Sequence, residues 1–193
     1  MKGKKILSAF IALVLIAGIP VAAFADTWYI DQGDITITVT TTETGDSQTV
    51  SQGETSKIDN APTISQTGSS KPTDNTVTIS ADAGATANVT LDGVNIDVSN
   101  NGKAGISTSG EGNVTIELEG DSTVKSGGLH AGLEKGNDGN LTIKDDGNNG
   151  SLTATGGFGG AGIGGGYNKG DGAGNVSNIT ISGGDINATG GQY

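Results

Sequence analysis

Acidic side chains stand in several short turns rich in Gly and Asn, and they are the first candidates for chemistry in this 193-residue chain. Asp138 lies in a Gly-Asn-Asp-Gly turn, Asp145 and Asp146 are adjacent, and Asp171 stands between two glycines. Carboxylates, Asn amides and backbone carbonyls are the oxygen ligands that Ca²⁺ prefers. We therefore predict calcium as a cofactor, with these four aspartates as its ligands. Because Asp is also an ordinary turn residue, solvated turns without metal are the alternative.

Three other side chains, Tyr167, Lys135 and His130, are candidates for binding a ligand. Tyr167 closes a glycine-rich run, 156–167, and could either present its ring to a sugar or pack across the loop. The run lacks a Gly-Lys-Ser/Thr ending and a following helix pattern, so it is not a phosphate-binding loop. Phe158, in the same run, is expected to pack in a corner. His130 is the only histidine, and a structural role is its alternative.

The residues that must position these side chains form an internal repeat, and a repeat that dominates a chain decides its fold. Three triplets, Ala-Gly followed by Ile or Leu, begin at Ala104, Ala131 and Ala161. Short apolar-Thr-apolar strands begin 25, 27 and 38 residues apart, at Val89, Val114, Leu141 and Ile179. Strand and turn lengths of this size predict a three-sided parallel β-helix.

This fold gives two specific expectations for the strands of the repeat. The four strands that begin at Val89, Val114, Leu141 and Ile179 should be neighbours in one parallel sheet. Alternate residues of a strand face the same side, so four apolar residues should point inward. These are Leu91, Ile116, Ile143 and Ile181.

An Asn-x-Thr triplet precedes or begins each of these strands. The asparagines are Asn88, Asn113, Asn140 and Asn178. The pattern matches N-glycosylation acceptors. Because it follows the repeat, we interpret it as structural, with Asn ending a turn and stacking on its copies in the neighbouring coils.

The first 25 residues have the pattern of a secretory signal peptide. Lysines at positions 2, 4 and 5 precede an apolar run from Ile6 to Ile19, and Ala23-Phe24-Ala25 fits a cleavage site. We predict cleavage after Ala25, because the apolar run is shorter than the roughly 20 residues of a membrane span. An uncleaved membrane anchor is the alternative. The protein is therefore expected to be secreted or attached to the cell surface.

The remaining chain, 26–193, is strongly acidic. It keeps all 21 Asp and Glu but only seven of the ten Lys, and the sequence has no Arg, so its formal charge is −14. Such a chain is expected to repel nucleic acid and anionic membrane surfaces. The sequence has no Cys, so a secreted protein of this kind must gain stability from its hydrogen-bonded strands or from bound metal.

Residues 26–76 are rich in Thr, Ser and Gln and are predicted to form an N-terminal β cap and the first coils, with a flexible linker as the alternative. Strands are expected at 35–39, 49–51 and 62–65, and a turn at Gly45–Ser47. Residues 77–193 are predicted to form the repeating coils of the same domain. The last coil lacks its third strand, which predicts that the chain is truncated at its C-terminus.

The repeated residues resemble a known family. His130-Ala131-Gly132-Leu133-Glu134-Lys135-Gly136, the glycine-rich run around Ala161, and Asn113 to Leu118 look like the secreted carbohydrate-binding β-helix proteins of anaerobic Gram-positive bacteria. The resemblance covers about residues 28–193. It implies a right-handed parallel β-helix like that of pectate lyases, binding of plant cell-wall polysaccharide, and bound calcium.

Two other functions fit the same fold. Polysaccharide lyases of this shape use a basic residue, often Arg, which this sequence lacks, although Lys135 or Lys144 could serve as the base. The motifs of pectin hydrolases are also absent from the sequence. A structural stalk or adhesin without a sugar site is the third function. We therefore expect a polysaccharide-binding protein that is not an enzyme; the sequence does not name the glycan or an oligomeric state.

Overall fold

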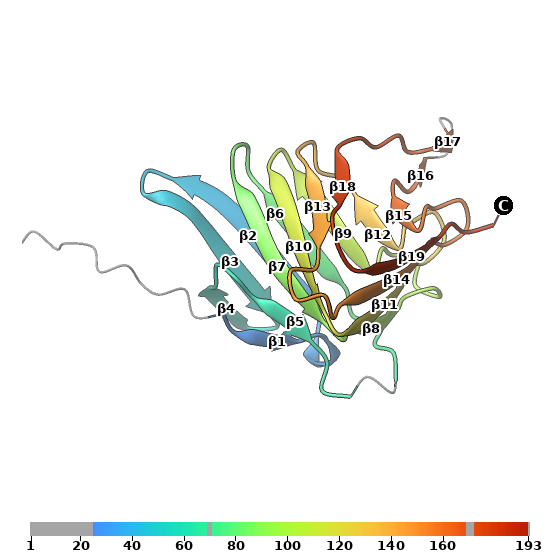
Figure 1. Ribbon diagram of the computed structural model, residues 1–193, viewed down its shortest axis with the longest axis horizontal. Coiled ribbons are helices and arrows are strands. Elements are labelled where there is room, and N and C mark those ends of the chain that lie inside the picture. Colours follow the sequence, from blue (N-terminus) through green and yellow to red (C-terminus); the bar gives the residue numbers. More distant parts are fainter. Residues whose placement is uncertain (1–24, 69–70, 169–171, 193) are drawn as a thin grey trace, which may run out of the picture.

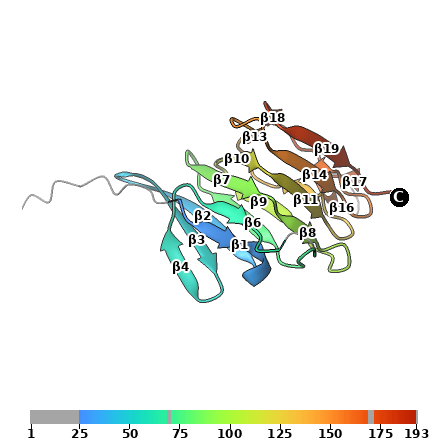
Figure 2. The same cartoon turned by 60° about the horizontal axis from the view of Figure 1, so that its bottom comes forward.

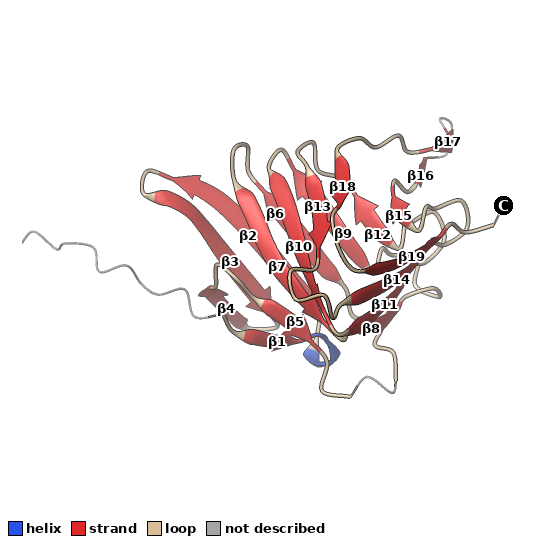
Figure 3. Ribbon diagram, viewed as in Figure 1, coloured by secondary structure: helices blue, strands red, loops and turns tan. Residues whose placement is uncertain are grey.

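A computed structural model describes residues 25–68, 71–168 and 172–192, and this part of the chain is almost entirely β-structure (Figures 1 and 3). Within it, the single helical element is one turn of 3-10 helix, η1 (Ile30–Gln32). The strands form three large sheets and one two-stranded ribbon. None of the helical structure in the described residues has the length and apolarity needed to cross a membrane.

The six-stranded sheet is wholly parallel and runs through the centre of Figure 1. Its strands, in spatial order, are β1 (Thr27–Tyr29), β5 (Thr63–Ser65), β7 (Thr86–Asp92), β10 (Asn113–Glu119), β13 (Leu141–Lys144) and β18 (Ile179–Ile181). Along β10, apolar residues alternate with Thr and Glu, and the apolar residues are the buried ones. This alternation explains why the segment forms a strand that has one face in the core.

Two further sheets flank the first. The four-stranded sheet contains β8 (Asn95–Asp97), β11 (Asp121–Lys125), β14 (Ser151–Thr155) and β19 (Asp185–Thr189), all parallel. The seven-stranded sheet contains β15 (Ile163–Gly164), β12 (Leu133–Lys135), β9 (Ile106–Gly110), β6 (Val77–Ala81), β2 (Ile35–Thr42), β3 (Gly45–Gln52) and β4 (Thr55–Ile58). The two-stranded ribbon is β16 (Tyr167–Asn168) with β17 (Gly172–Ala173).

The chain visits the three large sheets in a fixed order. From β7 to β15, each strand of the six-stranded sheet is followed by one of the four-stranded sheet and then by one of the seven-stranded sheet, and β18 is again followed by β19 of the four-stranded sheet. Successive passes stack on one another, as the progression of colours shows in Figure 2. The apolar faces of the three sheets meet in one core, in which large side chains such as Ile79, Leu91 and Ile116 are fully buried. The expected parallel arrangement of the repeated strands is confirmed.

The pairing of β7 with β10 differs from the sequence prediction by two residues. Val114 lies opposite Ala87, not opposite Val89, whereas Val114, Leu141 and Ile179 pair as expected. As a result, Thr63, Thr90, Glu117 and Lys144 lie in one row, each 27 residues after the one before. The three steps from β5 to β13 therefore have equal length, whereas the step from β1 to β5 is longer. A shift of two keeps every side chain on its face, so the inward direction of Leu91 was still predictable.

Three of the four residues expected to point inward are buried, and the fourth is not. Leu91, Ile116 and Ile143 are fully buried, but Ile181 is 50% exposed. Ile181 lies in β18, which is the last strand of its sheet among the described residues and has a neighbour on one side only. Ile181 pairs with the buried Ile143, so it lies on the inward face as predicted, but it stays exposed because no further strand of this sheet packs beside it in the described residues.

The repeated triplets mark a corner that is too crowded for a side chain. In each, the Ile or Leu begins a strand of the seven-stranded sheet, and Ile106, Leu133 and Ile163 pair with one another. The preceding glycines touch the neighbouring coil: a Cβ on Gly132 would lie 2.6 Å from the Gly162 oxygen, and one on Gly162 would lie 2.4 Å from the Thr189 nitrogen. Glycine recurs here because no other residue fits the space.

Only one step of the expected asparagine ladder is present. The Asn113 Oδ1 accepts hydrogen bonds from both the backbone nitrogen and the side-chain nitrogen of Asn140, at 2.9 and 3.2 Å. Asn88 lies opposite Thr115 because of the register shift, so it cannot continue this ladder. Asn178 has a positive φ of 59°, which fits its predicted role in ending a turn.

At the N-terminal end, β2, β3 and β4 extend the seven-stranded sheet as antiparallel strands. The expected strands at 35–39 and 49–51 are present, and the one expected at 62–65 is β5, which begins at Thr63, but the expected turn at Gly45–Ser47 is wrong, because Gly45 already belongs to β3. Ile58, in the outer strand β4, is 68% exposed. The β3–β4 hairpin places antiparallel backbone where a further parallel coil would otherwise have stacked.

Candidate functional site

The predicted ligand-binding residues His130, Lys135 and Tyr167 line the same cavity, whose volume is about 400 Å³. The cavity lies where β12 ends and the chain leaves the short strand β15 in a long loop. Glu134 and Val176 also line it, together with the glycines of this loop. Residues from two successive coils and from the loop thus meet at one place, because β12 and β15 are paired neighbours.

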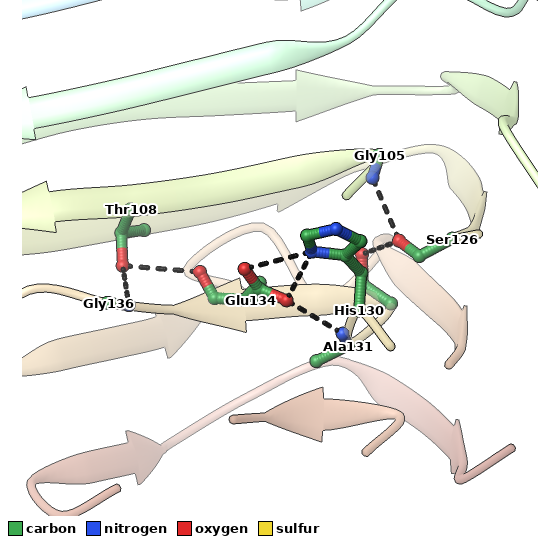
Figure 4. A network of polar contacts seen from close by, with 8 residues as sticks. Gly105, Thr108, Ser126, His130, Ala131, Glu134 and Gly136 are labelled. Carbon is green, nitrogen blue, oxygen red and sulfur yellow. Dashed lines mark hydrogen bonds and ion pairs between the residues drawn. The ribbon is translucent and has the colours of Figure 1, made fainter. Parts of the chain in front are cut away.

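An imidazole and a carboxylate face each other in the wall of this cavity (Figure 4). The His130 Nδ1 lies 2.9 Å from the Glu134 Oε2 and 3.2 Å from the Oε1. The same Oε2 accepts a hydrogen bond of 3.0 Å from the backbone nitrogen of Ala131. These contacts fix the carboxylate, while the His130 and Glu134 side chains remain 34% and 23% exposed. The pair is therefore both positioned and accessible to a ligand.

Lys135 lies on the other face of β12 and is only 5% exposed. Its ammonium donates a hydrogen bond to the Asn137 backbone oxygen. Asn137 is itself buried and bonded on both sides, accepting from the Thr108 hydroxyl at 2.8 Å and donating to the Gly112 oxygen at 2.9 Å. Burial lowers the pKa of the Lys135 amine, and the nearby Asp138 carboxylate acts in the opposite direction.

The Tyr167 ring packs across the loop and is only partly buried. Its atoms lie so close to Gly159 that a Cβ there would come within 3.1 Å of the ring. Gly159 also has a positive φ of 74°, which favours glycine. Phe158 is 54% exposed, so the expectation that it packs in a corner is wrong. Among the aromatic residues of this run, Tyr167 lines the cavity and Phe158 lies outside its lining.

One glycine of the loop is required by the site. A Cβ on Gly166 would lie 2.6 Å from the Glu134 Oε2 and 2.6 Å from the Leu129 oxygen. The backbone nitrogen of Tyr167 donates to that same Leu129 oxygen at 2.7 Å. The close approach of the loop to Glu134 therefore depends on the absence of a side chain at position 166.

The predicted calcium ligands are not brought together in the described residues. There, no group of three or more His, Cys, Asp or Glu residues could hold a metal ion. Asp138 is exposed in its turn, and Asp146 forms an ion pair with Lys144. Asp171 lies outside the described residues.

Asp145 has a structural role in its turn. It is largely buried, and its two carboxylate oxygens accept hydrogen bonds from the Asn149 and Gly150 nitrogens at 3.2 and 3.0 Å. A second hollow, of about 420 Å³, is lined by Asp145 together with Asp121 and Asp185. The described residues around it include no Lys or His.

Glu134 is the functional candidate that the sequence prediction missed. It stands four residues after His130 and directly before Lys135, so it was adjacent to two residues that had been singled out. Its importance arises from the turn at 130–133, which brings its carboxylate back to the Ala131 nitrogen. No protein-family model, curated protein or solved structure matches this chain.

Proposed function

We propose that the chain forms a right-handed, single-stranded parallel β-helix and binds polysaccharide in the cavity beside β12. The fixed order in which the chain visits its three sheets supports the solenoid. Parallel crossover connections in proteins are almost always right-handed, which supports the hand. The proposed location is outside the cell, after removal of the signal peptide.

The observation that carries the binding proposal is the meeting of His130, Glu134 and Tyr167 at one open cavity. Ligand sites commonly combine apolar or aromatic surface with a few fixed polar groups. Here the imidazole and the carboxylate offer hydrogen bonds to hydroxyl groups, and Tyr167 contributes aromatic surface. A chain of sugar units can extend from the cavity because it is open to solvent.

Charge favours a neutral glycan over an acidic one. The formal charge of the mature chain is −14, and Glu134 places a carboxylate in the cavity wall. A polyuronate would be repelled unless a divalent cation bridged the two. We propose that neutral plant cell-wall polysaccharides bind without calcium and that acidic, pectin-like chains bind only with it.

Affinity electrophoresis of the mature protein in gels containing xyloglucan, cellulose derivatives or polygalacturonate, with and without calcium, tests this function. For any glycan that retards the wild-type protein, Tyr167→Ala and Glu134→Gln should weaken binding at least tenfold. Thr38→Ala, on the exposed face of β2 and outside the cavity lining, is the matched control and should leave retention unchanged. If no glycan retards the wild-type protein, the binding proposal fails and a structural stalk takes its place.

A second candidate, a polysaccharide lyase, is favoured by one observation. Lys135 is among the residues that line the cavity, and burial lowers the pKa of its amine, a property that suits a general base, but its ammonium would first have to leave the Asn137 oxygen on the other face of β12. Incubation with polygalacturonate would reveal a lyase by the absorbance of its unsaturated products. The absence of such products over long incubation, together with retention on a glycan, would leave binding as the function.

A further inference from the structure

A buried carboxylate holds the N-terminal end of the described chain. Asp59, between β4 and β5, is 2% exposed. Its Oδ2 accepts hydrogen bonds from the indole nitrogen of Trp28 at 2.9 Å and from the backbone nitrogen of Asp26 at 3.1 Å. Its Oδ1 accepts from the Ala61 nitrogen at 3.2 Å. One side chain thus joins the start of β1 to the segment that leads into β5.

The donors to this carboxylate are neutral groups. Lys57, a basic side chain of this cluster, directs its ammonium to the Asp26 Oδ2 at 2.8 Å and lies 5.0 Å from the centre of the Trp28 ring. No ion pair joins Asp59 to a Lys or His among the residues that the structure describes. A buried carboxylate normally requires a positive partner.

The predicted signal cleavage would supply that partner. Hydrolysis of the Ala25–Asp26 peptide bond by a leader peptidase consumes one water molecule. The Ala25 carbonyl becomes a carboxylate, and the Asp26 nitrogen becomes a free amine that takes up a proton at neutral pH. This nitrogen is the atom that lies 3.1 Å from the Asp59 Oδ2.

We propose that Asp59 is a preformed receptor for the new N-terminus, so that cleavage converts a neutral hydrogen bond into a buried ion pair. The nitrogen need not move to make this pair. Charge-assisted hydrogen bonds are about twice as strong as neutral ones. Among the described residues β1 is a three-residue strand whose one partner is β5, so the ion pair fixes this edge of the six-stranded sheet. The proposal rests on the predicted cleavage and is independent of sugar binding.

The ion pair gives a defined pH dependence. Three titratable groups face the new amine: Asp59, the Asp26 side chain and Lys57. The buried Asp59 carboxylate should raise the pKa of the α-amine above its usual value of about 7.7–8.0. Because the folded-state pKa is raised, the stabilisation should be complete below about pH 7.7 and should disappear as the pH rises through the raised pKa.

Three forms of the mature protein test the proposal. The first begins at Asp26, the second is the same chain acetylated on its α-nitrogen, and the third begins at Ala25. The third carries a free amine one residue away and keeps a neutral amide at Asp26. Protein exported by a bacterium should first be sequenced from its N-terminus to establish that Asp26 is the first residue.

At pH 6 the form that begins at Asp26 should melt about 5 °C above the other two, and the difference should vanish near pH 11. Asp59→Asn should abolish the difference between free and acetylated chains. If that variant does not fold, the pKa of the α-amine, measured from the pH dependence of its acylation rate, provides an independent test. A usual pKa, equal melting temperatures at pH 6, or an exported protein that begins elsewhere would overturn the proposal.

Discussion

Glu117 and Lys144 lie directly opposite each other on the neighbouring strands β10 and β13, and their Oε2 and Nζ atoms are 2.5 Å apart. Lys144 also pairs with Asp146, whose backbone nitrogen donates back to the Glu117 Oε1 at 2.6 Å. These contacts form a closed ring, which connects strand β10 to the corner that follows its neighbour β13. Such a pair links two coils whose residues are 27 apart in the chain.

Glu117→Gln should lower the free energy of unfolding by about 1 kcal/mol, because it removes one of the two carboxylates that pair with Lys144 in this partly exposed ring. Glu119→Gln is the matched control, since Glu119 lies on the same face of β10 but is exposed. Its effect should stay within about 0.5 kcal/mol in the same urea titration. Equal effects of the two substitutions would show that the ring contributes nothing specific.

The pKa of Lys144 is raised, first by its hydrogen bond to Asp146 and then by Glu117. A group whose folded-state pKa is raised contributes stability that is complete below its unfolded pKa, about 10.4, and is lost as the pH rises through the folded value. The difference in stability between the wild type and Lys144→Met should therefore shrink above about pH 10. Urea titrations at pH 8 and at pH 11.5 measure it.

Lys135→Met should have the opposite pH signature. Burial lowers the folded-state pKa of Lys135, so the unfolded chain binds more protons between the folded and unfolded values, and wild-type stability should rise with pH in that window. The rise should be absent in Lys135→Met. If the stabilities of the wild type and the variant change in parallel from pH 7 to pH 10.5, the pKa of Lys135 is not lowered in the folded state.

Gly166→Ala should damage both the cavity and the stability of the loop. A Cβ there would lie 2.6 Å from Glu134 and from the Leu129 oxygen, which predicts a loss of about 1–3 kcal/mol in the free energy of unfolding and weaker glycan retention. Gly128→Ala is the control, because a Cβ at Gly128 would have no atom within 4 Å. Both variants can be compared by thermal melting and by affinity electrophoresis.

Asp145→Asn should destabilise the protein by about 1–2 kcal/mol in the presence of a chelator, because Asp145 holds two backbone nitrogens. Asp82→Asn, at an exposed position outside this turn, is its control. If calcium binds the folded chain, it should raise the melting temperature of the wild type by mass action. If the wild-type melting curves with millimolar calcium and with chelator superimpose, the folded chain does not bind calcium.

The repeating part of this fold was predictable because its sequence signals repeat. Alternating apolar residues fix which side of each strand is buried, and the triplets at Ala104, Ala131 and Ala161 align the coils. The register of β7 was not predictable from the sequence, because Ala87, Val89 and Leu91 all fit the interior equally well. A shift of two residues leaves that burial pattern unchanged, so the corners decide between the registers.

The parts that do not repeat could be predicted only in fragments. His130, Lys135 and Tyr167 were candidates by residue type, but the contact of Glu134 with His130 has no counterpart in the next coil, where Gly160 and Gly164 stand at the corresponding positions of a similar turn. The contact of Trp28 with Asp59 spans 31 residues and has no counterpart in the later coils that a pattern could reveal. Aspartates in turns are ambiguous from sequence, because capping a turn and binding a cation use the same oxygens.

The equal 27-residue spacing of the row from Thr63 to Lys144 has a mechanical consequence. Each coil is held mainly by the coils on either side of it. A force that pulls on the end at β19 therefore acts on the hydrogen bonds between one pair of neighbouring coils at a time. The protein should therefore yield by peeling, with coils released in sequence and not all at once. Each 27-residue coil between β5 and β13 would lengthen the chain by about 90 Å when released, since an extended residue spans about 3.3–3.6 Å.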